Sequence, residues 1–133
     1  MATVVDTCVV SFLHKSHENA KLYQPHLEGD LKVISFMTLA ELHYGTLKHD
    51  WGEPRRMDLR QHVEHEYVLF PFNRALCLQW AIVRDRTERI GRKLKHADSW
   101  IAATAMLYGM PLVTHNRRHF EVLAPDLRVI SES

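Results

Sequence analysis

Apolar positions along the chain follow two patterns, short uninterrupted runs and longer amphipathic stretches. The short runs are bounded by polar residues, Gly or Pro, which is typical of buried strands, and the longer stretches are typical of helices. Strands are predicted at residues 3–6, 31–35, 67–70, 111–114 and 127–130, the third as either a short strand or an extended link. Helices are predicted at residues 7–13, 18–27, 38–49, 54–65, 73–90 and 98–108, with a short helical turn at 116–123.

Pro and Gly support several of these boundaries. Pro54 falls in the first turn of its helix, where its missing N–H costs no hydrogen bond. Gly91 ends the long helix, and Gly109 follows the Ala-rich helix with Pro111 beyond it. The helix boundaries are therefore predicted from local chemistry as well as from periodicity.

The alternation of strands and helices indicates a parallel sheet covered by helices on both faces. The predicted fold class is α/β, a three-layer αβα arrangement around a mainly parallel sheet of four to five strands. With 133 residues, the chain is expected to form one domain over residues 1–133. Ligands of such sheets bind at the carboxyl ends of the strands, where Asp6 and residues 114–116 fall.

The composition is that of an ordinary globular protein, with 46% hydrophobic and 25% charged residues. No apolar run approaches the roughly 20 residues of a membrane span, and the N-terminus lacks the pattern of a signal peptide. Cys8 and Cys77 are too few for a disulfide framework and lack the spacing of a metal motif. These features favour a reduced, cytoplasmic compartment and no membrane partner.

The charge of the chain is nearly balanced, with 17 Lys and Arg residues against 16 Asp and Glu residues. Its distribution is more informative, because residues 84–95 hold six basic and two acidic side chains. This stretch is either a solvated helix face, with Asp85–Arg89 and Glu88–Arg92 as pairs one turn apart, or a patch that follows nucleic-acid phosphates.

Three carboxylates are expected at one edge of the sheet, because the segments that carry them follow parallel strands. They are Asp6 at the end of the first strand, Glu41 one turn into a helix, and Asp98 at the start of the Ala-rich helix. Each also has a structural explanation: Asp6 and Asp98 as helix N-caps, and Glu41 as the partner of the Thr38 backbone N–H in a capping box.

Convergence of these carboxylates would require a cation. Two carboxylates about 4 Å apart repel by roughly 4 kcal/mol at an effective dielectric near 20. Oxygen ligands suit a hard divalent ion, so the expected cofactor is Mg²⁺ or Mn²⁺. Such an ion activates water and stabilises the charge that develops on a phosphodiester during in-line attack. Asp6, Glu41 and Asp98 are therefore the candidate metal ligands and catalytic residues.

The order and spacing of five blocks resemble a PIN-domain ribonuclease, most closely the VapC-type toxins of bacterial toxin–antitoxin pairs. The blocks are MATVVDTCVV, ISFMTLAELHYGTLK, the long helix ending at Gly91, ADSWIAATA and LVTHNRRHF, and they cover nearly the whole chain. The combination of TLAELHYG with ADSWIAATA is specific, whereas DT near an N-terminus is weak alone. The resemblance implies that Asp6, Glu41 and Asp98 are metal-binding acids, with Thr7 as a supporting hydroxyl.

The same resemblance implies a PIN-like fold, metal-dependent cleavage of RNA, a homodimer, and inhibition by a small cognate antitoxin. The antitoxin would place a basic or apolar segment across the acidic pocket, and the complex could bind operator DNA. The identity of the RNA and of the antitoxin does not follow from the sequence, because base recognition depends on loop geometry.

Two positions depart from the commonest family pattern. Cys8 stands where Asn is frequent, and its simplest role is that of a small buried residue. The last motif often supplies a fourth acid, but THNRRHF has none. Asn116 is expected either to act in the site through its carbonyl oxygen or to cap the turn, and Thr114 and His119 to support the site. Without the fourth acid a second metal ion lacks a ligand, whereas the ligands expected for the first ion are all present.

The basic residues expected to contact RNA lie in two groups. Arg117 and Arg118 flank Asn116 directly, and Arg84, Arg92 and Lys93 belong to the basic stretch. His115 and His119, four residues apart, also admit a zinc site, although no third ligand follows them.

Two other functions compete with the nuclease. A degenerate PIN domain would bind RNA or a protein without cleaving it, and the missing fourth acid supports that alternative. An aspartyl-phosphate enzyme also has an Asp at a strand end, but the dehalogenase type needs a second Asp where Cys8 stands. A receiver domain would need a Lys on the last strand, which residues 127–130 do not offer.

Overall fold

The computed structural model describes residues 1–133, and strands and helices alternate along the chain as the sequence predicts. The 67–70 segment, left open between a strand and a link, contains a strand. The elements are β1 (Ala2–Val5), α1 (Thr7–Lys15), α2 (Ala20–Leu27), β2 (Leu31–Ser35), α3 (Phe36–Lys48), α4 (Glu53–Glu66), β3 (Val68–Phe70), α5 (Arg74–Arg89), α6 (His96–Leu107), β4 (Leu112–Val113), α7 (Arg117–Phe120) with a 3₁₀ turn at Glu121–Leu123, and β5 (Val129–Ile130).

The five strands form one parallel sheet in the order β3-β2-β1-β4-β5. From β1 the chain first adds strands on one side, β2 and then β3, and later adds β4 and β5 on the other side. The order therefore reverses between β1 and β4, and such a reversal opens a crevice at the carboxyl ends of the two strands. Asp6 directly follows β1 and Thr114 directly follows β4, so both residues lie at this crevice.

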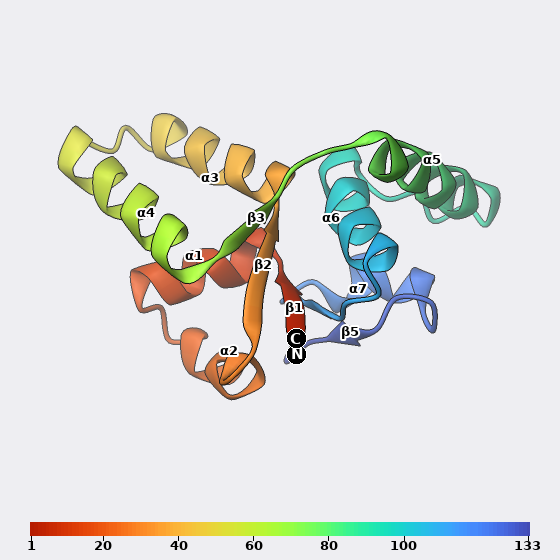
Figure 1. Cartoon of the computed structure of the whole chain (residues 1–133), viewed down its shortest axis with the longest axis horizontal. Helices are drawn as coiled ribbons and strands as arrows, with labels where there is room; N and C mark the ends of the chain where they lie inside the picture. The colour runs from red at the N-terminus through yellow and green to blue at the C-terminus, as the bar shows by residue number, and fades with distance from the viewer.

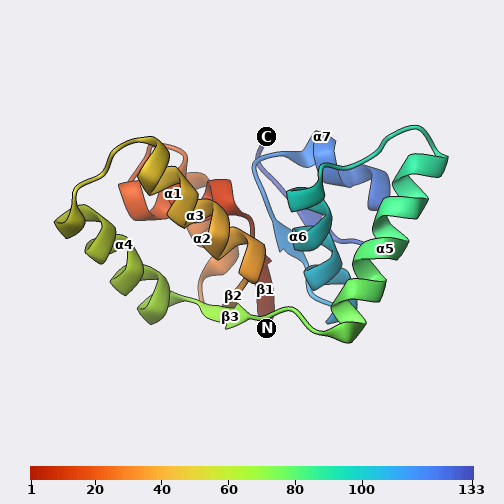
Figure 2. The same cartoon turned by 90° about the horizontal axis from the view of Figure 1, so that it is seen from above.

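Helices cover both faces of the sheet, which confirms the predicted three-layer α/β fold. In Figures 1 and 2, α1 to α4 lie on one side of the strands, and α5 to α7 lie on the other. Neighbouring strand residues point to opposite faces. Val4, Val33 and Leu112 accordingly join the core formed with α5 and α6, whereas Val5 and Ile34 join the core formed with α1, α2 and α4.

Two helices begin two residues earlier than the sequence predicts. The α3 helix begins at Phe36, because the Ser35 hydroxyl at the end of β2 accepts the Met37 backbone N–H and caps the helix. The α6 helix begins at His96 after Lys95, so Asp98 lies in its first turn. The prediction of Asp98 as an N-cap is therefore wrong, although a carboxylate in the first turn still interacts favourably with the helix dipole.

The predicted positions of Pro54 and Gly109 relative to their helices agree with the structure. Pro54 lies in the first turn of α4. Gly109 follows α6 with φ of +64°, a left-handed conformation that glycine adopts without steric cost. None of the helices combines the length and the apolar composition that crossing a bilayer requires.

Candidate active site

A cavity of about 370 Å³ lies where β1 and α1 meet, between α3 and the start of α6. Asp6, Glu41 and Asp98 all line this cavity, so the structure brings together the three carboxylates that the sequence singled out. They come from three different elements, which are the β1–α1 junction, α3 and α6. Thr7, Cys8 and Asn116 also line it.

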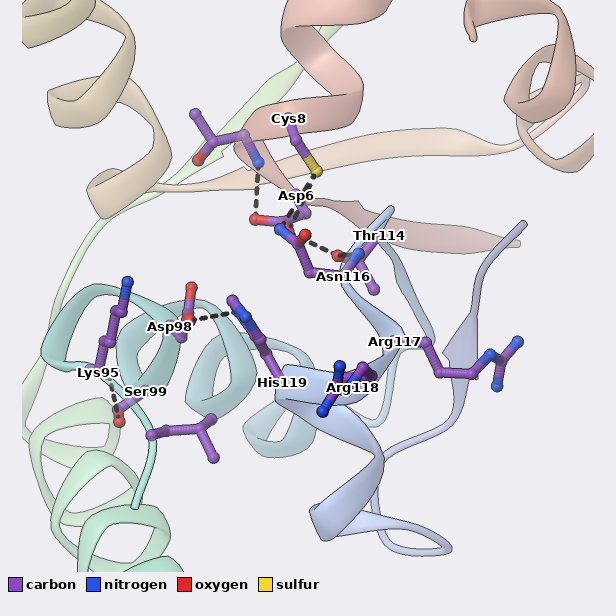
Figure 3. A network of polar contacts seen from close by, with 12 residues as sticks. Asp6, Cys8, Lys95, Asp98, Ser99, Thr114, Asn116, Arg117, Arg118 and His119 are labelled. Atoms are coloured by element: carbon purple, nitrogen blue, oxygen red, sulfur yellow. Dashed lines mark hydrogen bonds and ion pairs between the residues drawn. The ribbon is translucent and has the colours of Figure 1, made fainter. Parts of the chain in front are cut away.

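Asp6 is 3% exposed and has hydrogen-bond donors at both carboxylate oxygens. Its Oδ1 accepts the Thr7 backbone N–H at 2.8 Å, which confirms its predicted role as the N-cap of α1. Its Oδ2 accepts the Thr114 hydroxyl at 2.6 Å and lies 3.5 Å from the Cys8 thiol (Figure 3). The backbone and the two side chains fix the carboxylate in place while it still borders the cavity.

Glu41 is held by the neighbouring α1 helix. Its Oε1 accepts the Thr7 hydroxyl at 2.7 Å, and the same hydroxyl lies 3.0 Å from the Thr38 hydroxyl. The alternative of a capping box, in which Glu41 would bond the Thr38 backbone N–H, is wrong because Ser35 caps α3. Thr7 links Asp6 and Glu41, since its backbone contacts one carboxylate and its side chain contacts the other.

Asp98 faces His119 across the cavity edge. Its Oδ2 lies 3.2 Å from His119 Nδ1, and Figure 3 shows the two side chains pointing toward each other from α6 and α7. His115 instead bonds the Tyr23 hydroxyl through its Nδ1. Because the two histidines have different partners, the structure does not support the zinc site.

Burial, and then mutual repulsion, raises the pKa of each of the three carboxylates. Burial, followed by the charge of Asp98, raises the pKa of Asp6 against the hydrogen bonds that it accepts. Burial and the Asp6 charge raise the pKa of Glu41. Burial and the Glu41 charge raise the pKa of Asp98, although His119 acts to lower it. The cavity therefore concentrates negative charge that water cannot fully solvate.

This charge distribution fits a divalent cation in its chemistry, because three carboxylates offer hard oxygen donors and their mutual repulsion is relieved by a positive charge. As the side chains stand, however, no three His, Cys, Asp or Glu residues form a group that could hold a metal ion. The assignment of Asp6, Glu41 and Asp98 as metal ligands therefore stays a prediction.

The free energy of unfolding of the cation-free protein is expected to fall as pH rises above the ordinary pKa values of these three carboxylates. Their pKa values are raised above the ordinary 3.8 and 4.5. The folded state therefore binds more protons than the unfolded chain, and this stabilisation is complete below the unfolded pKa and lost through the folded pKa. The measurement is chemical unfolding in chelator, and the quantity compared is the free energy of unfolding of wild type and of Asp6→Asn at each pH.

We expect this difference to favour the variant increasingly as pH rises, because Asn carries no buried charge. Asp126→Asn is the matched control, since Asp126 is exposed and pairs with Arg86 on the surface. A difference between wild type and Asp6→Asn that stays constant from pH 4 to pH 8 would contradict the electrostatic description of the cavity.

The loop after β4 supplies the remaining polar groups. The Thr114 hydroxyl accepts the Asn116 backbone N–H at 3.0 Å, and Asn116 Nδ2 lies 3.9 Å from Cys8 Sγ. Asn116 lines the cavity and makes no side-chain cap to α7. Burial, followed by the Asp6 charge, raises the pKa of Cys8 to about 12, so the thiol stays protonated. Cys8 is half-buried, because it packs against the core and also lines the cavity.

The basic residues predicted to contact RNA have different positions. Arg92, Lys93 and Arg118 line a second cavity beside the first. Arg84 is buried and donates to the Leu94 carbonyl and to Glu88, so it stabilises the fold and does not face solvent. Arg117 donates to the Ser131 carbonyl and extends away from the carboxylates in Figure 3.

The surface pairs of the basic stretch also differ from the prediction in part. Asp85 and Arg89 form the expected ion pair at 2.8 Å. Glu88 pairs with Arg84 at 3.2 Å instead of Arg92.

Sequence reasoning gave no individual role to two groups of residues at the site, although Lys95 belongs to the basic stretch. Lys95 lines the second cavity together with Asp98, and its position three residues before Asp98 in the sequence is the signal that could have found it. Ser11, His14, Lys15 and Trp51 line the far end of the first cavity. Trp51 lies on the loop between α3 and α4, and no local pattern predicts that this loop folds back toward α1.

The chain is similar to known proteins both in sequence and in structure. The PIN domain family model matches residues 3–124. Ribonuclease VapC1 of Haemophilus influenzae is 29% identical over 123 residues, which cover 91% of both chains. Ribonuclease VapC4 of Mycobacterium tuberculosis is 28% identical over 100 residues, which cover 74% of this chain and 75% of that protein. Among solved structures, VapBC-1 of nontypeable Haemophilus influenzae has a TM-score of 0.78 at 25% identity, covering 98% of both chains. VapBC2 of Rickettsia felis bound to a promoter DNA fragment has a TM-score of 0.85 at 22% identity over the full length of both.

Proposed function

The chain belongs to the PIN domain family, and from this premise we propose that it is a metal-dependent endoribonuclease that acts as the toxin of a toxin–antitoxin pair. The observation that carries the proposal is the convergence of Asp6, Glu41 and Asp98 on one cavity. Two relatives of similar length are ribonucleases by name, which supports the same activity.

We further propose that Asp6, Glu41 and Asp98 hold Mg²⁺ or Mn²⁺ when the ion is bound. A hard divalent ion supplies Lewis-acid chemistry there, because it activates a water and offsets the charge that develops on the phosphodiester.

The protein side chains position these carboxylates. Thr114 and the Thr7 backbone N–H fix the Asp6 oxygens, and the Thr7 hydroxyl fixes Glu41. Preorganised groups of this kind need not reorganise during the reaction, which is how a polar site lowers a barrier. His119 lies 3.2 Å from Asp98 and orients its carboxylate. Asn116 would contact the substrate or a water at the cavity edge through its carbonyl oxygen.

The proposed partners follow from the relatives. Several similar structures are complexes of the VapBC type, and two of these were determined with DNA. We propose a cognate antitoxin that covers the acidic cavity, a homodimer, and a hetero-oligomer that binds operator DNA. The proposed substrate is RNA, with Arg118, Arg92 and Lys93 as phosphate contacts.

The experiment that tests the activity is incubation of total cellular RNA with the purified protein, followed by mapping of the new 5′ ends. We expect a few discrete cuts that disappear when the cognate antitoxin is added in excess. Diffuse degradation that the antitoxin does not affect would indicate a contaminating nuclease and contradict the proposal.

The second candidate is a PIN domain that binds RNA or a protein partner without turnover. It is favoured by one observation, the absence of an acid between Thr114 and His119. Intact RNA after prolonged incubation with Mg²⁺ or Mn²⁺, together with measurable RNA binding, would support this alternative. The three retained carboxylates favour the enzyme.

A further inference from the structure

A second cavity of about 270 Å³ lies directly beside the three carboxylates. It is enclosed by the segment between α5 and α6, the first turn of α6, and α7. Asp98 lines both cavities, so the two spaces are adjacent. The lining residues are Arg92, Lys93, Leu94, Lys95, Asp98, Arg118, His119 and Val122.

This second cavity is positively charged, in contrast to the first. Four Lys and Arg side chains line it against a single carboxylate, and that carboxylate already faces His119 at 3.2 Å. The charge left without a close partner is therefore positive. A negatively charged group would gain from entering this space and would be repelled by the space next to it.

Two of the four cations are available for a ligand. Arg92 lies 3.9 Å from Glu121 and donates to the Arg118 carbonyl, and Lys93 lies 3.9 Å from Glu88. The side chains of Lys95 and Arg118 make no ion pair and no hydrogen bond with the protein. In Figure 3 the Lys95 side chain runs beside that of Asp98, and Arg118 projects from α7 on the other side of His119.

We propose that this cavity binds a phosphate of the RNA backbone adjacent to the phosphate that is cut, with Lys95 and Arg118 as its contacts. The proposal rests on the proposed nuclease function and names where that function obtains its affinity for RNA. The carboxylate cavity repels phosphates unless a cation is present, so binding needs positive charge close by. Arg118 offers a planar fork that matches a phosphate, and Lys95 offers a point charge.

Lys95 and Arg118 differ from the other basic candidates, whose side chains have partners within the protein. Arg84 is buried within the fold, and Arg117 donates to Ser131 at the C-terminus. Arg92 donates to the Arg118 carbonyl and lies 3.9 Å from Glu121, so it is less free than Lys95 and Arg118 to contact a phosphate. Phosphate binding therefore depends most on Lys95 and Arg118.

The test measures binding of a fluorescein-labelled single-stranded RNA dodecamer by anisotropy in EDTA, which removes the divalent ion that the proposed cleavage requires. The variants are Lys95→Gln, Arg118→Gln and the double variant. The matched control is the double variant Lys21→Gln with Arg128→Gln, because both residues are exposed, lie on α2 and before β5, and line neither cavity. Thermal melting of every variant confirms that it is folded.

We expect the Kd of the Lys95→Gln/Arg118→Gln variant to rise by about tenfold or more. Its salt dependence should weaken by about 0.7 in log Kd per log salt, since each neutralised phosphate of a single strand contributes roughly that amount. The control should stay within about twofold of wild type. In cleavage assays the same variant should raise KM more than it lowers kcat, because a contact beside the reacting bond supplies uniform binding.

The outcomes separate this proposal from the nuclease proposal. Cleavage by wild type together with an unchanged Kd in the double variant would overturn the phosphate site and leave the nuclease intact. A raised Kd in the double variant, with no cleavage by wild type, would support the phosphate site and refute the nuclease. A loss of affinity seen only with 5′-phosphorylated RNA, and not with 5′-hydroxyl RNA, would indicate recognition of a chain end and overturn the assignment to an internal phosphate.

Discussion

Asp6→Asn is expected to reduce the rate of RNA cleavage by about a thousandfold or more, since loss of a cation that stabilises several kcal/mol of developing charge costs a factor of ten for each 1.4 kcal/mol. Asn has nearly the size of Asp and keeps one oxygen that can accept the Thr114 hydroxyl. The substitution therefore removes the charge and leaves the packing. The measurement is the single-turnover cleavage rate of a purified RNA.

The same variant is expected to fold at least as stably as wild type. Asp6 is 3% exposed and its pKa is raised by burial, so a neutral side chain relieves an unfavourable charge. Asp126→Asn, on the exposed segment before β5, should cleave RNA at the wild-type rate. A rate for Asp6→Asn within tenfold of wild type would contradict a catalytic role for the Asp6 charge.

Thr114→Val is expected to lower the free energy of unfolding by about 1–3 kcal/mol and the cleavage rate by at least about tenfold. Thr114 is fully buried, and its hydroxyl donates to Asp6 Oδ2 at 2.6 Å and accepts the Asn116 N–H at 3.0 Å. Valine has the same shape but no hydroxyl, so a buried carboxylate loses its shortest donor and a backbone N–H loses its partner.

Thr104→Val is a matched control for this substitution. Thr104 is equally buried, but its hydroxyl donates only to the Trp100 carbonyl within α6. Within a helix that carbonyl can still accept a backbone N–H, so it does not depend on the Thr104 hydroxyl. The change should therefore cost less than about 1 kcal/mol and leave cleavage unchanged. Equal effects of Thr114→Val and Thr104→Val on cleavage would show that the contact with Asp6 does not position the carboxylate for the reaction.

The topology could be predicted from the sequence because the apolar runs are short and the segments between them are amphipathic. A parallel sheet then follows, and its carboxyl edge gathers the residues at the ends of the strands. This is why Asp6 and Thr114 were found, since each directly follows a strand. Asp98 was found because it lies near the start of a helix that enters the same edge.

The contacts of these residues could not be predicted, because their partners come from other elements. The local signal pairs Glu41 with Thr38, but in the structure Thr7 of α1 provides the hydrogen bond to Glu41. Composition cannot separate Arg84, which is buried against Leu94, from Lys95, which faces the second cavity. All basic residues of the stretch look alike in the sequence, but in the fold some are buried and others face a cavity.

The most direct test of the central claim is the Mg²⁺ dependence of cleavage by protein stripped with chelator, measured with one purified RNA for wild type and Asp98→Asn. If the cavity of Asp6, Glu41 and Asp98 is the catalytic centre, wild type should be inactive in chelator. Its activity should return with saturable dependence on Mg²⁺ or Mn²⁺, and Asp98→Asn should recover little at any concentration tested. Cleavage at the same rate in chelator, or full recovery of the variant, would contradict the claim.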